Sequence, residues 1–98
     1  MVRVRIPPAF LKALRSLSEP RRKRAIGRLH LFQARPNDPA LRLRPFRAVP
    51  GFFLIDLPRG DRILLRKEGS DTYAAIDVGG HELYPEWERL RDDGDSAV

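Results

Sequence analysis

Two spacings of apolar residues divide the chain into a helical first part and a strand-rich second part. Residues 2–6 alternate between apolar and basic side chains, which predicts a short strand with one basic face. Two series at helical spacing follow, namely Phe10, Leu14 and Leu17, and then Ala25, Leu29 and Phe32. Ser18-Glu19-Pro20 separates the two series, with Ser18 suited to cap the second helix. The first half therefore predicts a strand and two amphipathic helices.

Three later segments alternate with period two and predict strands at residues 52–57, 62–67 and 73–78. One face of these strands is apolar and comprises Phe53, Ile55, Leu57, Ile63, Leu65, Ala74, Ile76 and Val78. The other face is mixed and comprises Phe52, Leu54, Asp56, Arg62, Leu64, Arg66, Tyr73, Ala75 and Asp77. We expect the apolar face to pack on the helices and the mixed face to be open to solvent or to a ligand.

The order of the predicted elements, β-α-α-β-β-β, indicates an α+β fold. In this fold the two N-terminal helices pack on one face of a small, mostly antiparallel sheet. Residues 85–90 predict a last helical turn that carries Trp87. We expect a single domain over residues 1–91 and a frayed acidic tail at residues 92–98.

The composition of the chain excludes several kinds of site. The 98 residues contain no cysteine, which excludes disulfides, thiolate metal sites and cysteine nucleophiles. The two histidines cannot build a structural zinc site alone, so we expect neither a metal nor a cofactor. No run approaches the ~20 apolar residues of a membrane span, and the N-terminus lacks an apolar run of signal-peptide length. We therefore expect a cytoplasmic protein that does not contact a membrane.

Positive charge is concentrated in the first half of the chain. Residues 1–48 have a net charge of +11, whereas residues 49–98 have a net charge of −5. Sixteen of the nineteen basic residues are arginine, whose planar guanidinium matches the geometry of phosphate. We therefore expect the first half to attract a polyanion or an acidic protein. The run Arg21-Arg22-Lys23-Arg24 is typical of a solvated helix face, and contact with ribosomal RNA is the alternative.

Four segments carry a family resemblance. They are residues 10–17, Arg35-Pro36-Asn37-Asp38-Pro39-Ala40-Leu41-Arg42, Gly60-Asp61-Arg62-Ile63-Leu64-Leu65, and Val78-Gly79-Gly80-His81-Glu82-Leu83-Tyr84. In this order and spacing they resemble the RelE/ParE superfamily, the toxin halves of bacterial type II toxin–antitoxin pairs. The resemblance implies a ribosome-dependent endoribonuclease that cleaves mRNA in the A site without metal. The ParE branch implies instead a non-nuclease inhibitor of DNA gyrase, and a third alternative is an inactive relative that only binds RNA or a partner.

The nuclease branch also implies site residues. Its pattern of basic residues, a strand-initial arginine and a histidine near a terminal aromatic matches Arg42, Arg44 and Arg47, then Arg62, then His81 with Tyr84. Arg62 would stabilise charge on the phosphorane, His81 would transfer a proton, and Tyr84 would position the substrate. The predicted RNA-binding set is Arg42, Arg44, Arg47, Arg66 and Lys67.

Each of these residues also has a structural interpretation. Cross-strand charge pairs would join Arg62 and Arg66 to Asp56 and Asp77. His81, beside a Gly-Gly turn, can be an ordinary surface residue, and Tyr84 can cap the core together with Trp87.

The resemblance implies a cognate antitoxin as well, in addition to the ribosome and mRNA. An antitoxin of this kind silences its toxin with an acidic or amphipathic segment. The net charge of the first half and the mixed sheet face would accept such a segment through complementary charge and apolar anchors.

Overall fold

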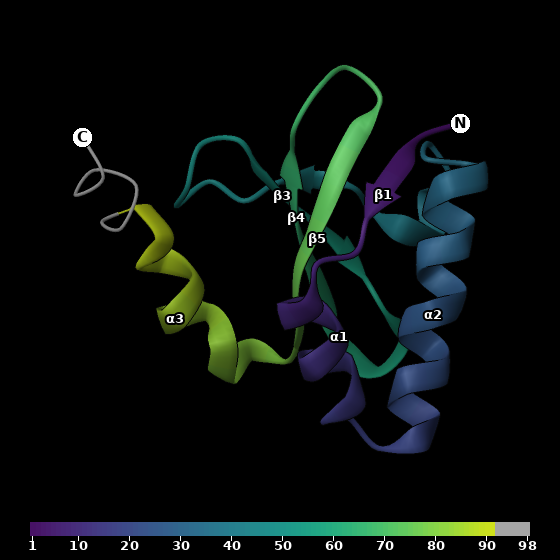
Figure 1. Cartoon of the computed structure of the whole chain (residues 1–98), viewed down its shortest axis with the longest axis vertical. Coiled ribbons are helices and arrows are strands. Elements are labelled where there is room, and N and C mark those ends of the chain that lie inside the picture. The colour runs from purple at the N-terminus through teal and green to yellow at the C-terminus, as the bar shows by residue number, and fades with distance from the viewer. Residues whose placement is uncertain (92–98) are drawn as a thin grey trace.

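One five-stranded mixed sheet forms the centre of the protein, as a computed structural model describes it for residues 1–91 (Figure 1). The strands are β1 (Arg3–Arg5), β2 (Arg44–Pro45), β3 (Phe52–Asp56), β4 (Arg62–Lys67) and β5 (Thr72–Gly79). They lie in the order β1-β5-β4-β3-β2. The first strand runs parallel to β5, and the other neighbours are antiparallel.

Helices cover both sides of this sheet. They are α1 (Pro8–Arg15), α2 (Glu19–Ala34) and α3 (Tyr84–Glu88), with short 3-10 turns η1 (Pro39–Leu41), η2 (Pro58–Gly60) and η3 (His81–Leu83). Proline occupies the first turn of α1 and of α2, where its missing N–H leaves no bond unmade. The first two helices lie on one side of the sheet and α3 lies on the other (Figure 1). No helix in residues 1–91 is long and apolar enough to cross a membrane.

The larger apolar core lies between the sheet and the first two helices. Its most deeply buried side chains are Phe10, Ala25, Phe32, Leu41, Ile55, Ile63, Leu65 and Ala75. The helical series of the first half supplies one layer of this core and alternate strand positions supply the other. The prediction that the two helices pack on the apolar sheet face is confirmed.

A second, smaller core lies on the opposite face. It comprises Phe46, Val49, Leu54, Leu64 and Trp87, with Phe52, Ile76, Leu83 and Tyr84 packed against it. The prediction that the mixed face is open is therefore wrong for this region. Trp87 is only 2% exposed and packs α3 against Leu54 and Leu64. Burial of its large apolar ring stabilises this arrangement.

A β-bulge in β5 overturns part of the predicted face assignment. Leu64 is paired with Asp77 but the next residue, Leu65, is paired with Ala75, so Ile76 is the extra residue. The extra residue reverses the alternation, and Tyr73 and Ala75 face the larger core. The prediction from the sequence placed Ala74 and Ile76 in that core instead, because it assumed that side chains alternate between the two faces along the whole strand.

The predicted α+β class and the order of helices and strands are confirmed, with one addition. The two-residue strand β2 escaped prediction because it is too short to show a period and contains Pro45. The acidic tail expected at residues 92–98 lies outside the described residues.

Candidate functional site

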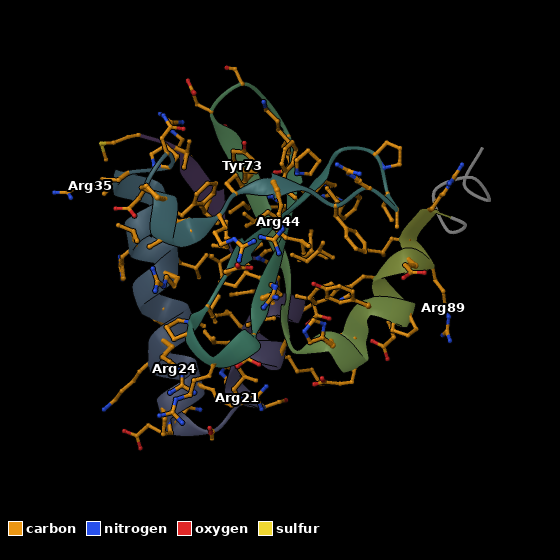
Figure 2. All side chains as sticks on the ribbon, turned by 180° about the vertical axis from the view of Figure 1, so that it is seen from behind. Arg21, Arg24, Arg35, Arg44, Tyr73 and Arg89 are labelled. Carbon is orange, nitrogen blue, oxygen red and sulfur yellow. The ribbon has the colours of Figure 1, made fainter. Side chains whose placement is uncertain are left out.

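The polar part of the mixed face is formed by residues that the pairing of β2, β3, β4 and β5 brings side by side. Arg44 of β2 is paired with Leu54, two residues before Asp56 in β3. Asp56 is paired with Arg62 of β4, and Arg62 with Gly79 of β5. Alternate residues of a strand share a face, so Arg44, Asp56 and Arg62 lie on one surface. Figure 2 shows Arg44 over the middle of the sheet, with α2 to one side and α3 to the other.

Asp56 lies at the centre of an arginine cluster, which consists of Arg42, Arg44 and Arg62 around this carboxylate. The carboxylate oxygens of Asp56 lie 2.8 Å from Nε of Arg62, 3.0 Å from Nη2 of Arg44 and 3.5 Å from Nε of Arg42. Oδ1 of Asp56 nevertheless accepts no hydrogen bond, because neither nearby N–H points at it. The carboxylate therefore gathers the guanidinium groups by charge and leaves two positive charges in excess.

Arg62 owes its orientation to the turn before β4. Its Nη1 donates hydrogen bonds to the carbonyl oxygens of Gly60 at 2.7 Å and Asp61 at 3.2 Å. Its side chain is only 17% exposed, so the guanidinium is held against the sheet rather than extended into water. Within residues 1–91 no hydrogen bond occupies Nη2 of Arg62. This group is the edge of the side chain that a bound anion can use.

Arg42 stands in an unusual backbone conformation that brings it into the cluster. Its φ of 49° lies in the left-handed region, which a residue other than glycine seldom adopts. Its carbonyl oxygen accepts a hydrogen bond of 2.7 Å from Nη1 of Arg44. This bond ties the Arg44 side chain to the backbone of Arg42, and both guanidinium groups reach Asp56.

His81 and Tyr84 lie side by side at the C-terminal end of β5. Their ring centroids are 5.3 Å apart, and His81 is exposed whereas Tyr84 is half-buried. A side chain at Gly79 would collide with Leu83, so glycine there allows η3 to fold back closely. Because Arg62 is paired with Gly79, the strand register sets His81 two residues beyond the partner of Arg62.

Tyr84 satisfies its structural interpretation at the same time. Its ring centroid lies 5.8 Å from that of Phe46 and 5.3 Å from that of Trp87, within the smaller core. The ring is thus fixed on one side by aromatic contacts and borders His81 on another. A fixed, half-exposed aromatic ring is suited to stack on a base.

The remaining predicted RNA-binding residues lie apart from the arginine cluster. Arg66 is four residues along β4 from Arg62, about 13 Å at the usual strand rise, and pairs with Glu68 at 3.0 Å. Hydrogen bonds from Arg5 and then Arg66 lower the pKa of Glu68 to about 2. Lys67 is exposed at the end of β4, and Arg47 is exposed in the loop between β2 and β3.

The predicted charge pairs are half right. Arg62 pairs with Asp56 as expected, but Arg66 does not pair with Asp77. Asp77 instead accepts hydrogen bonds from the Trp87 indole at 2.9 Å and from the Val78 amide at 2.8 Å. The register accounts for this, because Asp77 is paired with Leu64 rather than with Arg66 and lies under Trp87 of α3.

Sequence reasoning missed that Arg42 and Arg44 reach the same carboxylate as Arg62. The face of Arg44 follows from its pairing in β2, and that strand gave no signal in the sequence. The described part of the chain holds no group of three or more His, Asp or Glu side chains arranged to bind a metal ion. The chemistry that the arginine cluster offers is anion binding, and the register of β4 and β5 brings Arg62 opposite the residue two positions before His81.

Comparison with known proteins relates this fold to bacterial toxins. Neither a family profile nor a curated protein sequence matches the chain. Among solved structures, the E. coli RelBE toxin–antitoxin complex matches with a TM-score of 0.62 and 21% identity, over 82% of this chain and 96% of that one. The isolated E. coli RelE toxin matches with a TM-score of 0.60 and 22% identity, over 92% and 98%.

A third match comes from another organism. The RelBE2 toxin–antitoxin complex of Mycobacterium tuberculosis has a TM-score of 0.54 and 19% identity, over 82% of this chain and 98% of that one. The TM-scores show a shared architecture, whereas identities of 19–22% leave the activity to be argued from the site. The chain has the fold of the RelE toxins.

Proposed function

We propose that this chain is the toxin of a toxin–antitoxin pair and acts as a metal-independent endoribonuclease on mRNA in the ribosomal A site. The observation that carries the proposal is the arginine cluster of a RelE-type fold, whose Arg62 is paired with Gly79, two residues before His81.

The arginine cluster suits the charge that develops during RNA cleavage. When the 2′-hydroxyl attacks the adjacent phosphate, negative charge grows on the non-bridging oxygens of the phosphorane. The excess of two positive charges and the unoccupied Nη2 of Arg62 are suited to stabilise it. Asp56 keeps three like charges close together before RNA arrives, so less reorganisation is needed on binding.

His81 is the residue assigned to proton transfer. It is exposed, lies beyond the strand residue that pairs with Arg62, and is of the one type that exchanges protons readily near neutral pH. In the proposed reaction a proton leaves the 2′-hydroxyl and another reaches the departing 5′-oxygen. Tyr84 would hold a base by stacking, and the exposed Arg47, Arg66 and Lys67 would contact the RNA backbone.

An antitoxin partner follows from the same comparison. The E. coli RelE neighbours include a complex with RelB and a complex of a mutant toxin with a RelB peptide. We assign this chain a partner of the same kind, whose acidic segment is attracted by the basic first half. Such a pair works in the cytoplasm, where ribosomes and mRNA are present.

Primer extension on programmed ribosomes tests the proposal. Purified protein is added, at the magnesium concentration that the ribosome needs, to ribosomes that hold a defined codon in the A site. Cleavage at that codon is expected, and it should be about 100-fold slower in Arg62→Gln and strongly slowed in His81→Gln. The matched control Arg35→Gln removes one exposed charge at the far end of α2 and should cleave as the wild type does.

Two results would contradict the proposal. Folded protein that leaves the message intact would exclude the nuclease, and a gyrase supercoiling assay would then test the ParE-like alternative. Cleavage that survives in both site variants would mean that the reaction takes place elsewhere on the molecule.

A further inference from the structure

A second ion pair joins α2 to the turn before Arg62. Arg21, in the first turn of α2, binds Asp61 with two parallel hydrogen bonds, from Nε to Oδ2 and from Nη2 to Oδ1, both 2.9 Å long. Asp61 is 7% exposed and is the one buried charged residue in residues 1–91. Buried carboxylates need such pairing, and the two-bond geometry fixes direction as well as distance. The sequence treated the run that contains Arg21 as a solvated face, and for Arg21 this is wrong.

The same aspartate is part of the turn that orients Arg62. The carbonyl oxygen of Asp61 accepts hydrogen bonds from Nη1 of Arg62 at 3.2 Å and from the amide of Leu57 at 2.9 Å. The preceding carbonyl, that of Gly60, accepts the shorter bond of 2.7 Å from the same Nη1. The side chain of Asp61 thus accepts hydrogen bonds from Arg21, while its backbone carbonyl accepts one from Arg62.

The hydrogen bonds to these two carbonyl oxygens determine how the Arg62 guanidinium is oriented. Its ion pair with Asp56 is close at 2.8 Å but is not aligned as a hydrogen bond. Charge attraction fixes how near two groups lie, whereas hydrogen bonds fix how they are turned. The direction in which Nη2 of Arg62 points is therefore set by the turn.

The turn needs an outside contact to keep its shape. Arg59 and Gly60 have φ values of 67° and 93°, both in the left-handed region. A non-glycine residue in that region is strained and persists where the surroundings hold it. In the described chain, the bonds from Arg21 are the side-chain hydrogen bonds that reach this turn in addition to those of Arg62 itself. Figure 2 shows Arg21 at the end of α2 far from Arg35 and well away from Arg44.

We propose that Arg21 and Asp61 are positioning residues for Arg62. Their ion pair anchors the β3–β4 turn to α2, and the turn carbonyls then hold Nη2 of Arg62 outward for a phosphate. The assignment of phosphate as the ligand rests on the proposed function, whereas the positioning can be measured without RNA.

The experiment uses the full chain with ¹⁵N labelling of arginine. The Nε–H signal of Arg62, identified by its loss in Arg62→Lys, reports the environment of the guanidinium. In Arg21→Gln we expect this signal to shift and its proton to exchange with solvent at least tenfold faster than in the wild type. Lys23→Gln is the control, because it removes an exposed charge from the same helix and should leave the signal unchanged.

Two further variants separate positioning from folding. Arg21→Lys keeps the charge but cannot make the two-bond contact, so an intermediate exchange rate is expected. Asp61→Asn keeps the backbone carbonyl while weakening the pair, and it should act in the same direction as Arg21→Gln. Folding of each variant is verified by its thermal transition. An unchanged Arg62 signal in folded Arg21→Gln or Asp61→Asn would overturn the proposal.

The cleavage assay then links the positioning to function. In a double-mutant cycle, Arg21→Gln should slow cleavage about tenfold in the wild-type background and have no effect when Arg62 is already glutamine. A slowing of equal size in both backgrounds would overturn the positioning role. If the wild type does not cleave, the proposed function fails, and the Arg62 signal still decides whether the pair positions this side chain.

Discussion

The face of the sheet under α1 and α2 and the face beside α3 use side chains from the same strands, yet they are filled differently. Leu64 and Leu65, adjacent in β4, are both fully buried, one in each core. The core under the first two helices is continuous and apolar from β1 to η1. The side chains of the opposite face change within a few residues from the apolar ones packed against Trp87 to those of the arginine cluster. One face is wholly apolar, and the other gives up part of its apolar area to hold the charges of the arginine cluster.

The largest effect should come from a leucine pair that compares the two cores directly. We expect Leu65→Ala to lower the free energy of unfolding by about 4 kcal/mol and Leu64→Ala by about 2–3 kcal/mol. The smaller core is bounded by the short helix α3, which can shift into the space that is left. Urea denaturation of both variants gives the values. A larger loss in Leu64→Ala would show that the smaller core is the more important one.

A site variant should show the opposite balance. Arg62→Gln is expected to slow mRNA cleavage about 100-fold, which corresponds to about 2.7 kcal/mol of transition-state stabilisation. Its unfolding free energy should change by less than about 1 kcal/mol, because Asp56 keeps Arg44 within 3.0 Å. The rate comes from primer extension and the stability from urea denaturation. A variant that loses stability and activity together would break the distinction between the two faces.

A smaller effect is expected where α3 is joined to the sheet. Trp87→Phe keeps an aromatic ring but removes the indole hydrogen bond to Asp77, so we expect a loss of about 1–2 kcal/mol in unfolding free energy. Tyr84→Phe is the matched control in the same helix, with an expected change within about 0.5 kcal/mol. Thermal unfolding of the two variants tests this, and equal transition temperatures would argue against a role for the indole hydrogen bond.

The smallest effect is a pH dependence at the far end of the sheet. Hydrogen bonds from Arg5 and Arg66 lower the pKa of Glu68 from 4.5 to about 2. A lowered carboxylate pKa stabilises the folded state above pH 4.5, and this contribution disappears as the pH falls from 4.5 to about 2. Glu68→Gln should therefore have a lower urea midpoint than the wild type at pH 6, and the difference should vanish near pH 2. A difference that persists at pH 2 would mean that another interaction was lost.

Much of the fold could be predicted because apolar spacing is a local signal. The helical series around Phe10 and Leu29 and the alternation in β3 and β4 each extend over enough residues to show a period. The bulge at Ile76 could not be predicted, since both sets of alternate residues in β5 include apolar side chains. Only the pairing with β4 decides which set faces the larger core.

The residues of the candidate site were chosen from the sequence, but their arrangement could not be predicted from it. The resemblance supplied Arg62, His81 and Tyr84, and the β3–β4 hairpin register supplied the contact with Asp56. The contacts of Arg42 and Arg21 depend on a left-handed residue and on an ion pair between positions forty residues apart. Neither has a periodic signature, because each is a consequence of the tertiary packing.

The parallel pairing of β1 with β5 has a consequence for when the sheet is completed during synthesis. Strand β1 finds its partner in β5, as Arg3 is aligned with Thr72. At roughly 5–20 residues per second, the ribosome needs on the order of 4–14 s to make the intervening chain. Contacts so distant in sequence form late and slow the folding rate. Because His81 follows the end of β5, the arginine cluster and this histidine come together only after the chain as far as His81 has been made and has left the exit tunnel.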